Sequence, residues 1–206
     1  MLEALIPGIH DHTLSPQDRF NIQTDVYALA RAGHLVYIDY LKLLRYAYKH
    51  EDNLTVWKSI LRQLSELSSI FDYAHLNDTK RLYRAYVVDL LENIYQQLGW
   101  NPLTNESAQL TILRSLILTQ LGVNGYEQVS REAHRRFQTF VHGRNNSFFP
   151  DPNIRTAVYL TVAKTGNEQI FDQLKSVNPF LRSHPFSICR CSSISKQILK
   201  KNAFDY

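Results

Sequence analysis

The chain has 206 residues, of which 44% are hydrophobic and 20% are charged, a composition typical of a globular protein and not of a disordered or fibrous one. Its net charge of +4 comes from basic residues scattered along the chain, which does not favour nucleic acid as a partner. Two cysteines cannot form a disulfide framework for the body of the protein, and no apolar stretch is long enough to predict a membrane span.

Eight stretches with apolar residues at helical spacing follow one another along the chain. They cover residues 22–29, 36–47, 56–71, 83–98, 110–121, 129–141, 154–162 and 170–177. Five glycines come just after such stretches and are expected to end helices, namely Gly33, Gly99, Gly122, Gly143 and Gly166. Ser15-Pro16 and Asp151-Pro152 are each expected to begin a helix, as an N-cap residue followed by a first-turn proline.

Helices joined by short loops suit an α-solenoid as well as a globular bundle. Pairs of the predicted helices recur at very roughly 40–47 residues, the repeat length of HEAT and armadillo proteins. We therefore predict an all-α fold, a superhelical array of antiparallel helix pairs like that of HEAT or armadillo proteins, over residues 1–180. Residues 181–206 lack this rhythm and are expected to form a divergent tail.

One segment begins like a zinc-peptidase motif. His50-Glu51 matches the start of HExxH, in which two histidines one helical turn apart bind zinc and the glutamate activates water. Leu54 stands where the second histidine is needed. We therefore interpret this segment as a solvated loop.

Other candidate ligands and nucleophiles are equally incomplete. His10 and His12 have only Asp11 as an acidic neighbour, and Cys189 and Cys191 lack a second ligand pair. The sequence contains no Gly-rich phosphate loop and no nucleophile elbow. We therefore predict no catalytic, metal-binding or cofactor-binding residue in this chain.

Tyrosines gather on one predicted helix. Tyr37, Tyr40, Tyr46 and Tyr48 face more than one direction, and amphipathic packing with the hydroxyls at the surface explains them. A peptide-binding groove is the alternative interpretation.

Ordered short motifs resemble the C-terminal helical domain of zinc aminopeptidases, the group that includes aminopeptidase N and the puromycin-sensitive and endoplasmic-reticulum enzymes. In chain order they are Asp18-Arg19-Phe20, Asp25 to Gly33 (DVYALARAG), Thr55-Val56-Trp57, Leu98-Gly99-Trp100, Glu106 with Leu113-Arg114-Ser115-Leu116, Ala133 with Arg136-Phe137, and Pro152-Asn153-Ile154-Arg155 with Val158-Tyr159 and Gly166. The resemblance covers about residues 8–180.

This resemblance implies a HEAT-like domain that caps the catalytic domain, so that peptides reach the zinc through a large internal cavity. The partners that it implies are peptide substrates and the catalytic domain of the same polypeptide. The motifs are most similar to those of the puromycin-sensitive subfamily, which implies a cytoplasmic location. The family-motif residues to which it assigns structural roles are Asp18, Arg19, Asp25, Gly33, Trp57, Gly99, Trp100, Arg114, Phe137, Arg155 and Tyr159.

The chain departs from the family in lacking HExxH with its downstream glutamate and the GAMEN-like loop that binds the free amino terminus. Its only methionine is Met1, which excludes a hidden GAMEN loop. We therefore expect a truncated, non-catalytic fragment, with zinc held by the catalytic domain that this sequence does not include. The alternative is a stand-alone α-solenoid that binds a peptide or protein.

Overall fold

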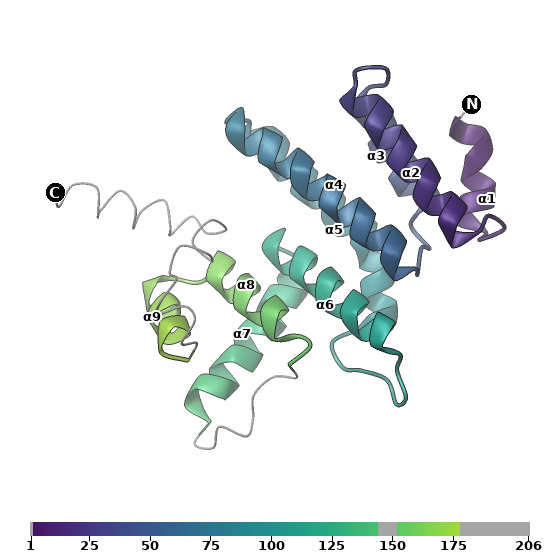
Figure 1. The fold of residues 1–206 in the computed structure, drawn as a ribbon. Coiled ribbons are helices and arrows are strands. Elements are labelled where there is room, and N and C mark those ends of the chain that lie inside the picture. The colour runs from purple at the N-terminus through teal and green to yellow at the C-terminus, as the bar shows by residue number, and fades with distance from the viewer. Residues whose placement is uncertain (1, 144–151, 178–206) are drawn as a thin grey trace. The chain divides into compact units, whose positions relative to one another are not determined.

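The structure, a computed structural model, describes residues 2–143 and 152–177 (Figure 1). Within these ranges all regular structure is helical, and none of the helices combines the length and the apolar character that crossing a membrane requires. Their bounds are η1 (Leu2–Leu5), α1 (Ile6–His10), α2 (Pro16–Arg31), α3 (Tyr37–Ala47), α4 (Leu54–Tyr73), α5 (Asn77–Leu98), α6 (Ala108–Val123), α7 (Glu127–His142), α8 (Arg155–Thr165) and α9 (Glu168–Val177). The chain divides into two compact units, Met1–Ile117 and Leu118–Tyr206, with the boundary inside α6.

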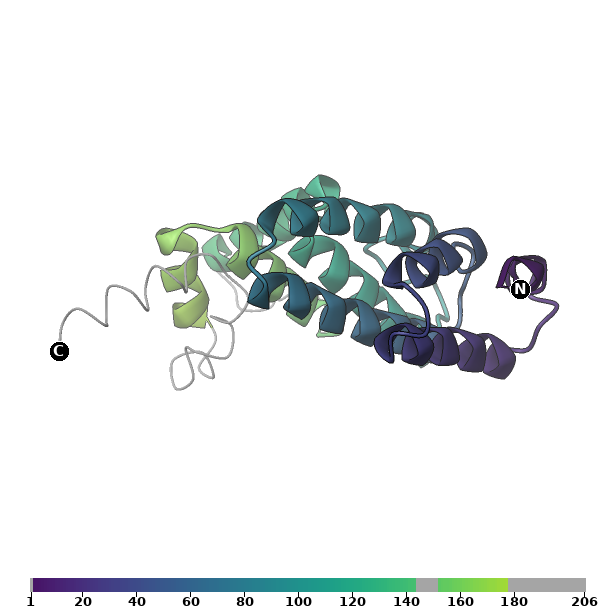
Figure 2. The ribbon, with the colours of Figure 1, turned by 90° about the horizontal axis from the view of Figure 1, so that it is seen from above.

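In the first unit, consecutive helices pack as antiparallel pairs. The start of α2 lies beside the end of α3, where the Tyr48 hydroxyl donates to the carbonyl of Arg19 at 2.6 Å. The end of α4 lies beside the start of α5, where the rings of Phe71 and Tyr83 are 5.1 Å apart (Figure 2). Helix α2 also packs on α4, and α1 packs on α3. Contacts between alternate as well as consecutive helices give the layered arrangement of a solenoid.

Local signals explain where the first helices begin. Ser15 and Asp18 form a capping box: the Ser15 hydroxyl accepts from the Asp18 amide at 3.2 Å, and the Asp18 carboxylate accepts from the Ser15 amide at 3.3 Å. Asn53 caps α4 by accepting from the amide of Thr55 at 2.9 Å. Each cap satisfies amides that the first helical turn leaves without a partner.

In the second unit, α7 packs against α8 and α8 against α9. Phe137 of α7 is fully buried and meets Tyr159 of α8 edge-on, with ring centroids 6.2 Å apart. Gly122 near the end of α6 faces Thr161 of α8 so closely that an added Cβ would lie 1.8 Å from the threonine Oγ1. A side chain at position 122 therefore has no room, and glycine permits this close approach.

The structure confirms the all-α prediction and the eight predicted helices, which are α2 to α9. It adds η1 and α1, two short elements that the apolar pattern did not reveal. It also shifts two predicted ends. Gly122 lies within α6, and Gly125 takes up the positive φ of 84° after it. Pro152 lies in a turn, and α8 begins only at Arg155.

Among the residues whose burial is described, the predicted apolar faces are mostly buried, with two exceptions in the first unit. Leu29 and Val36 were expected to face the core, yet their side chains are 44% and 59% exposed. The buried face of α2 instead includes two polar side chains, Arg19 and Gln23. Residues 181–206, the expected tail, lie outside the described residues.

Candidate functional site

A buried ion pair joins α2 to the loop between α3 and α4. The guanidinium of Arg19 donates to both carboxylate oxygens of Glu51, from Nε at 2.7 Å and from Nη2 at 2.9 Å. The two side chains are 3% and 1% exposed. Removing two charges from water costs several kcal/mol per ion, and a two-pronged geometry with further hydrogen bonds is needed to offset that cost.

The further hydrogen bonds are present. The Glu51 carboxylate also accepts from the backbone amides of Asp52 at 3.1 Å and Asn53 at 2.8 Å. Arg19 uses its remaining nitrogen, Nη1, to donate to the carbonyl of Leu14 at 2.8 Å. The indole of Trp57 donates to the Glu51 carbonyl at 2.8 Å. This set, which we call the Arg19 node, joins the start of α2 to the loop between α3 and α4 and to the start of α4.

The interpretation of residues 50–54 as a solvated loop is therefore wrong for Glu51. Glu51 is buried because it pairs with Arg19. The two residues are 32 positions apart in the sequence, and the spacing of a local motif carries no information over that distance. His50 does lie at the surface. Its ring contacts that of His10 edge-on at 4.5 Å.

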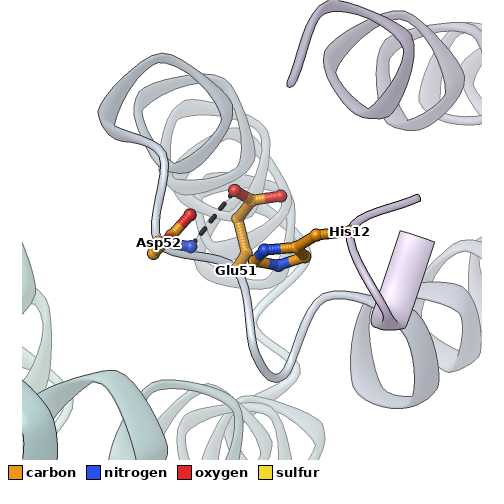
Figure 3. Close-up of side chains that lie close together, drawn as sticks. All are labelled: His12, Glu51 and Asp52. Carbon is orange, nitrogen blue, oxygen red and sulfur yellow. Dashed lines mark hydrogen bonds between the residues drawn. The ribbon is translucent and has the colours of Figure 1, made fainter. Parts of the chain in front are cut away.

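One group of side chains in the described residues has the composition of a metal site. Ligand atoms of His12, Glu51 and Asp52 lie within 4.8 Å of one another (Figure 3). The Glu51 carboxylate, however, already accepts two hydrogen bonds from Arg19 and two from backbone amides. A divalent cation would have to take this carboxylate from a guanidinium and would lie beside that positive charge. His12 and the exposed Asp52 alone do not make a structural or catalytic zinc site, which needs at least three protein ligands.

A second buried pair holds the loop between α5 and α6. Both terminal nitrogens of Arg114 donate to the carboxylate of Glu106, and its Nε donates to the Leu98 carbonyl at 3.1 Å. Glu106 also accepts from the Leu103 amide at 3.1 Å and the Thr111 hydroxyl at 3.0 Å. The hydrogen bonds from Arg114, above all, lower the pKa of Glu106 to about 2. We call this set the Arg114 node.

Tyrosine hydroxyls supply the remaining buried polar contacts of the first unit. Tyr40 is fully buried and donates to the amide oxygen of Gln63, and Tyr27 donates to the Glu66 carboxylate at 2.8 Å. Burial raises the pKa of Tyr40 and Tyr27 well above the ordinary value. The expectation of surface hydroxyls is therefore wrong for Tyr40. It is also wrong for Tyr48, whose hydroxyl bonds to the Arg19 carbonyl.

Hollows open on both sides of α3 at the surface of the first unit. The first has a volume of about 580 Å³ and lies between α3 and the N-terminal elements. The second, of about 410 Å³, lies between α3 and α5 and is lined by Ile38, Leu41, Lys42, Arg45, Tyr46, Phe71, Thr79, Leu82, Tyr83 and Tyr86. We call the second hollow the α3–α5 groove. Of the four tyrosines that suggested a peptide-binding groove in the sequence, Tyr46 lines this hollow.

The family-motif residues take several different structural positions. Arg19, Trp57 and Arg114 belong to the two buried nodes, and Asp18 caps α2. Gly33 and Gly99 follow α2 and α5 with φ of 80° and 56°, which glycine adopts without strain. The others are placed as follows: Trp100, Phe137 and Tyr159 are buried, Arg155 begins α8 half-buried, and Asp25 is exposed on α2.

The described residues bring no nucleophile, base and orienting group together in one cleft. His134 is the histidine whose pKa burial lowers, and its Nε2 lies 2.8 Å from the exposed Thr165 hydroxyl, without a carboxylate to orient it. The buried carboxylates Glu51 and Glu106 are each neutralised by an arginine. The two buried pairs therefore join neighbouring helices and loops of the first unit.

The known proteins to which this chain is similar are aminopeptidases, and the family model that matches is a C-terminal domain. The family model described as the ERAP1-like C-terminal domain matches residues 1–204, a span that includes the region expected to diverge after residue 180. The chain is 31% identical over 161 residues to Aminopeptidase M1-A of Oryza sativa subsp. japonica, and 29% identical over 170 residues to Aminopeptidase M1 of Arabidopsis thaliana. It is 27% identical over 177 residues to the puromycin-sensitive aminopeptidase of Caenorhabditis elegans.

These alignments are unequal in their coverage. They include 78%, 81% and 86% of this chain but 18%, 19% and 18% of the three relatives. The chain thus spans about a fifth of the length of the curated relatives it matches.

Proposed function

Since the chain belongs to the ERAP1-like C-terminal domain family, we propose that it is the helical module of a zinc aminopeptidase, which caps the catalytic site and shapes the cavity through which peptides arrive. The module supplies walls and rigidity, and it removes no amino-terminal residue by itself. The observation that carries the proposal is the family match over residues 1–204 in a chain whose sequence lacks HExxH and a GAMEN-like loop.

The packing of the first unit supports a wall-forming role. The Arg19 node ties the start of α2 to the loop before α4, and the Arg114 node ties the end of α5 to α6. A domain that closes over a cavity must keep its shape as peptides enter and leave. Buried ion pairs with every oxygen and nitrogen engaged give this rigidity, because movement would expose unpaired charges.

Zinc, which the resemblance places in the parent enzyme, does not fit residues 50–54, where this chain has the beginning of the zinc-peptidase motif. Leu54 occupies the position of the second histidine, and Arg19 neutralises the Glu51 that would activate water. We therefore assign zinc to the catalytic domain of the same polypeptide and give it no step in this chain. Peptides are the proposed substrates of that enzyme, and the cytoplasm is its proposed location.

A segment exchange in an active relative tests the proposal. The segment of rice Aminopeptidase M1-A that matches over 161 residues is replaced by the aligned part of this chain, and a second variant carries a flexible linker in its place. We measure kcat/KM for an aminoacyl chromogenic substrate and for peptides of increasing length. The exchange variant is expected to keep a length preference that the linker variant loses, because the module closes the cavity. An exchange variant that behaves like the linker variant overturns the proposal.

A stand-alone α-solenoid that binds a peptide or protein is the second candidate, and the α3–α5 groove is the observation in its favour. The first candidate requires that the gene also encodes a catalytic domain, and the second does not. Sequencing of the native transcript upstream of Met1 separates the two: an upstream frame with HExxH and a GAMEN-like loop supports the aminopeptidase module, and its absence supports the stand-alone protein.

A further inference from the structure

We propose that the α3–α5 groove is a docking site for an amphipathic helix with an acidic flank. The inference goes beyond the cavity-shaping function and does not depend on it, since it concerns a surface of the first unit alone. Three features carry it: a preformed apolar floor, walls with exposed apolar side chains, and a rim whose charges are cationic.

The floor of the groove is held in place before anything binds. Tyr83 donates its hydroxyl to the Leu64 carbonyl at 2.6 Å, and Tyr86 donates to the Leu41 carbonyl at 2.7 Å. Because both hydroxyls are engaged below the surface, the rings cannot swing away and the groove presents their carbon atoms. A preformed apolar floor lets a partner bind without the entropic cost of ordering it.

The walls expose apolar side chains that the fold leaves uncovered. Ile38 and Tyr46 of α3 are 54% and 60% exposed, and Leu82 of α5 is 65% exposed. Single exposed apolar residues are ordinary on protein surfaces, but these three line one hollow together with the floor tyrosines. Covering them would remove a contiguous apolar surface from water, which is the driving force for a groove to bind a helix.

The spacing of the lining residues favours a helical occupant. The α3 side contributes residues 38, 41, 42, 45 and 46, and the α5 side contributes 79, 82, 83 and 86. Both sets follow the i, i+3, i+4, i+7 pattern, so the groove is a channel between two helix ridges about two turns long. A third helix fits such a channel with its own apolar residues at the same spacing, as in helix-in-groove recognition.

The charged side chains that line the groove favour a negatively charged partner. The lining includes Lys42 and Arg45 and no carboxylate. Arg45 is half-exposed beside Asp89, with Nε and Oδ2 3.4 Å apart, whereas no carboxylate of the described part of the chain forms an ion pair with Lys42. Lys42 lies between the two hollows and also lines the other one, together with the acidic side chains of Glu3 and Asp39. A glutamate or aspartate on the partner would complete the rim.

Direct binding to the purified chain tests the proposal by fluorescence anisotropy. The probe is a labelled, end-capped peptide of about 15 residues, long enough to form a helix when bound, with leucines at helical spacing and glutamates on the flanks. A second probe replaces every glutamate by lysine, and a third has the first composition in an order without a helical stripe. The acidic probe is expected to bind at least about tenfold more tightly than either of the others.

Variants locate the binding surface. Leu82→Asp and Ile38→Asp are expected to weaken the acidic probe at least about tenfold, because each places a carboxylate in the apolar walls. Lys42→Glu is expected to shift the preference toward the lysine probe. Ile112→Asp is the matched control, since Ile112 is a 44% exposed isoleucine of α6 that does not line the groove, and it should leave binding unchanged.

The fold of each variant is checked by circular dichroism and by the fluorescence of Trp57 and Trp100. Equal binding of the acidic and lysine probes, or undiminished binding in folded Leu82→Asp, overturns the proposal. Self-association of the chain that Leu82→Asp abolishes, without affinity for the acidic probe, also overturns it by showing a second copy as the occupant.

Discussion

The two units of the chain place their charges differently. The first unit buries two arginine–glutamate pairs, Arg19 with Glu51 and Arg114 with Glu106, with side chains at most 3% exposed. In the second unit, Glu132 on α7 is partly exposed and binds Arg135 and Arg136, each at 2.7 Å. The interior of this unit instead uses apolar rings and a glycine that lets two helices approach.

This difference predicts which kinds of substitution destabilise each unit. A surface pair is screened by water and contributes little, while a buried pair leaves an uncompensated charge when one partner is removed. In the first unit the buried pairs also hold the loops that connect helices, so losing one releases backbone as well as charge. The second unit should instead respond most to changes in volume.

The largest expected effect comes from Glu51→Gln. The amide keeps the size of the side chain but leaves the buried Arg19 without a carboxylate, which should lower the free energy of unfolding by about 3–5 kcal/mol. Urea denaturation followed by tryptophan fluorescence measures this in the first unit, because the chain has two tryptophans and both, Trp57 and Trp100, lie there.

A double variant serves as the control for that prediction. Arg19→Met with Glu51→Leu removes both charges and should recover part of the lost stability, as apolar replacements of buried pairs do. If Glu51→Gln proves as mild as a surface substitution, the two kinds of ion pair do not differ as we describe.

Acid should weaken the first unit through Glu106. Arg114 lowers the pKa of the folded carboxyl to about 2, below its ordinary 4.5, so the folded state binds this proton less readily than the unfolded state. The contribution of the pair to stability is complete above the ordinary value and is lost as pH falls from about 5 toward about 2. The urea midpoint from tryptophan fluorescence should drop over this window, and Glu106→Gln should flatten the drop. An unchanged pH profile in that variant would show that other carboxyls cause it.

Gly122→Ala tests the volume sensitivity of the second unit. The new methyl would lie 1.8 Å from Thr161 Oγ1 and 2.8 Å from its Cβ, so the helices must separate, at a cost of about 1–3 kcal/mol. Thermal unfolding followed by circular dichroism measures the loss, and Thr161→Ala should relieve it in part. Gly125→Ala is the comparison variant: its added methyl meets no atom within 4 Å, so it measures the backbone strain of a positive φ without a clash. Equal stability of Gly122→Ala and the wild type would contradict the close approach.

The smallest effect is expected for Glu132→Gln on α7. Its two arginine partners lower the pKa of Glu132 to about 2, yet the side chain is 25% exposed and water can solvate what remains. The free energy of unfolding should change by less than about 1 kcal/mol. Salt at about 0.5 M should reduce the change further, because the Debye length falls to about 4 Å at that ionic strength. A loss as large as that of Glu51→Gln would remove the contrast between the units.

Helix-spaced apolar residues were enough to predict an all-α fold and the helices α2 to α9. The stripe from Val56 to Leu67 and the stripe from Tyr83 to Ile94 are buried as expected, because a helix has one face to hide and its period is fixed. Capping at Ser15 was likewise readable from local sequence. Short α1 was missed because one turn and a half of helix displays no period.

The polar interior could not be predicted in the same way. Glu51 follows an exposed histidine in a charged loop, and nothing nearby in the sequence reveals that Arg19 will meet it. Tyr40 bonds to Gln63, which lies 23 positions later, so its burial is also set by tertiary packing. Arg19, Trp57 and Arg114 are among the residues that the family resemblance singles out, and the structure places them in the two nodes.

The most direct test of the central claim, that this chain is a scaffold without peptidase chemistry of its own, is a joint assay of the purified 206-residue protein. Zinc content is measured by mass spectrometry, and release of amino-terminal residues is measured on peptides, with an active M1 aminopeptidase as the positive control. We predict zinc far below one ion per chain and no release above the buffer. Stoichiometric zinc together with residue release that a chelator abolishes would contradict the account.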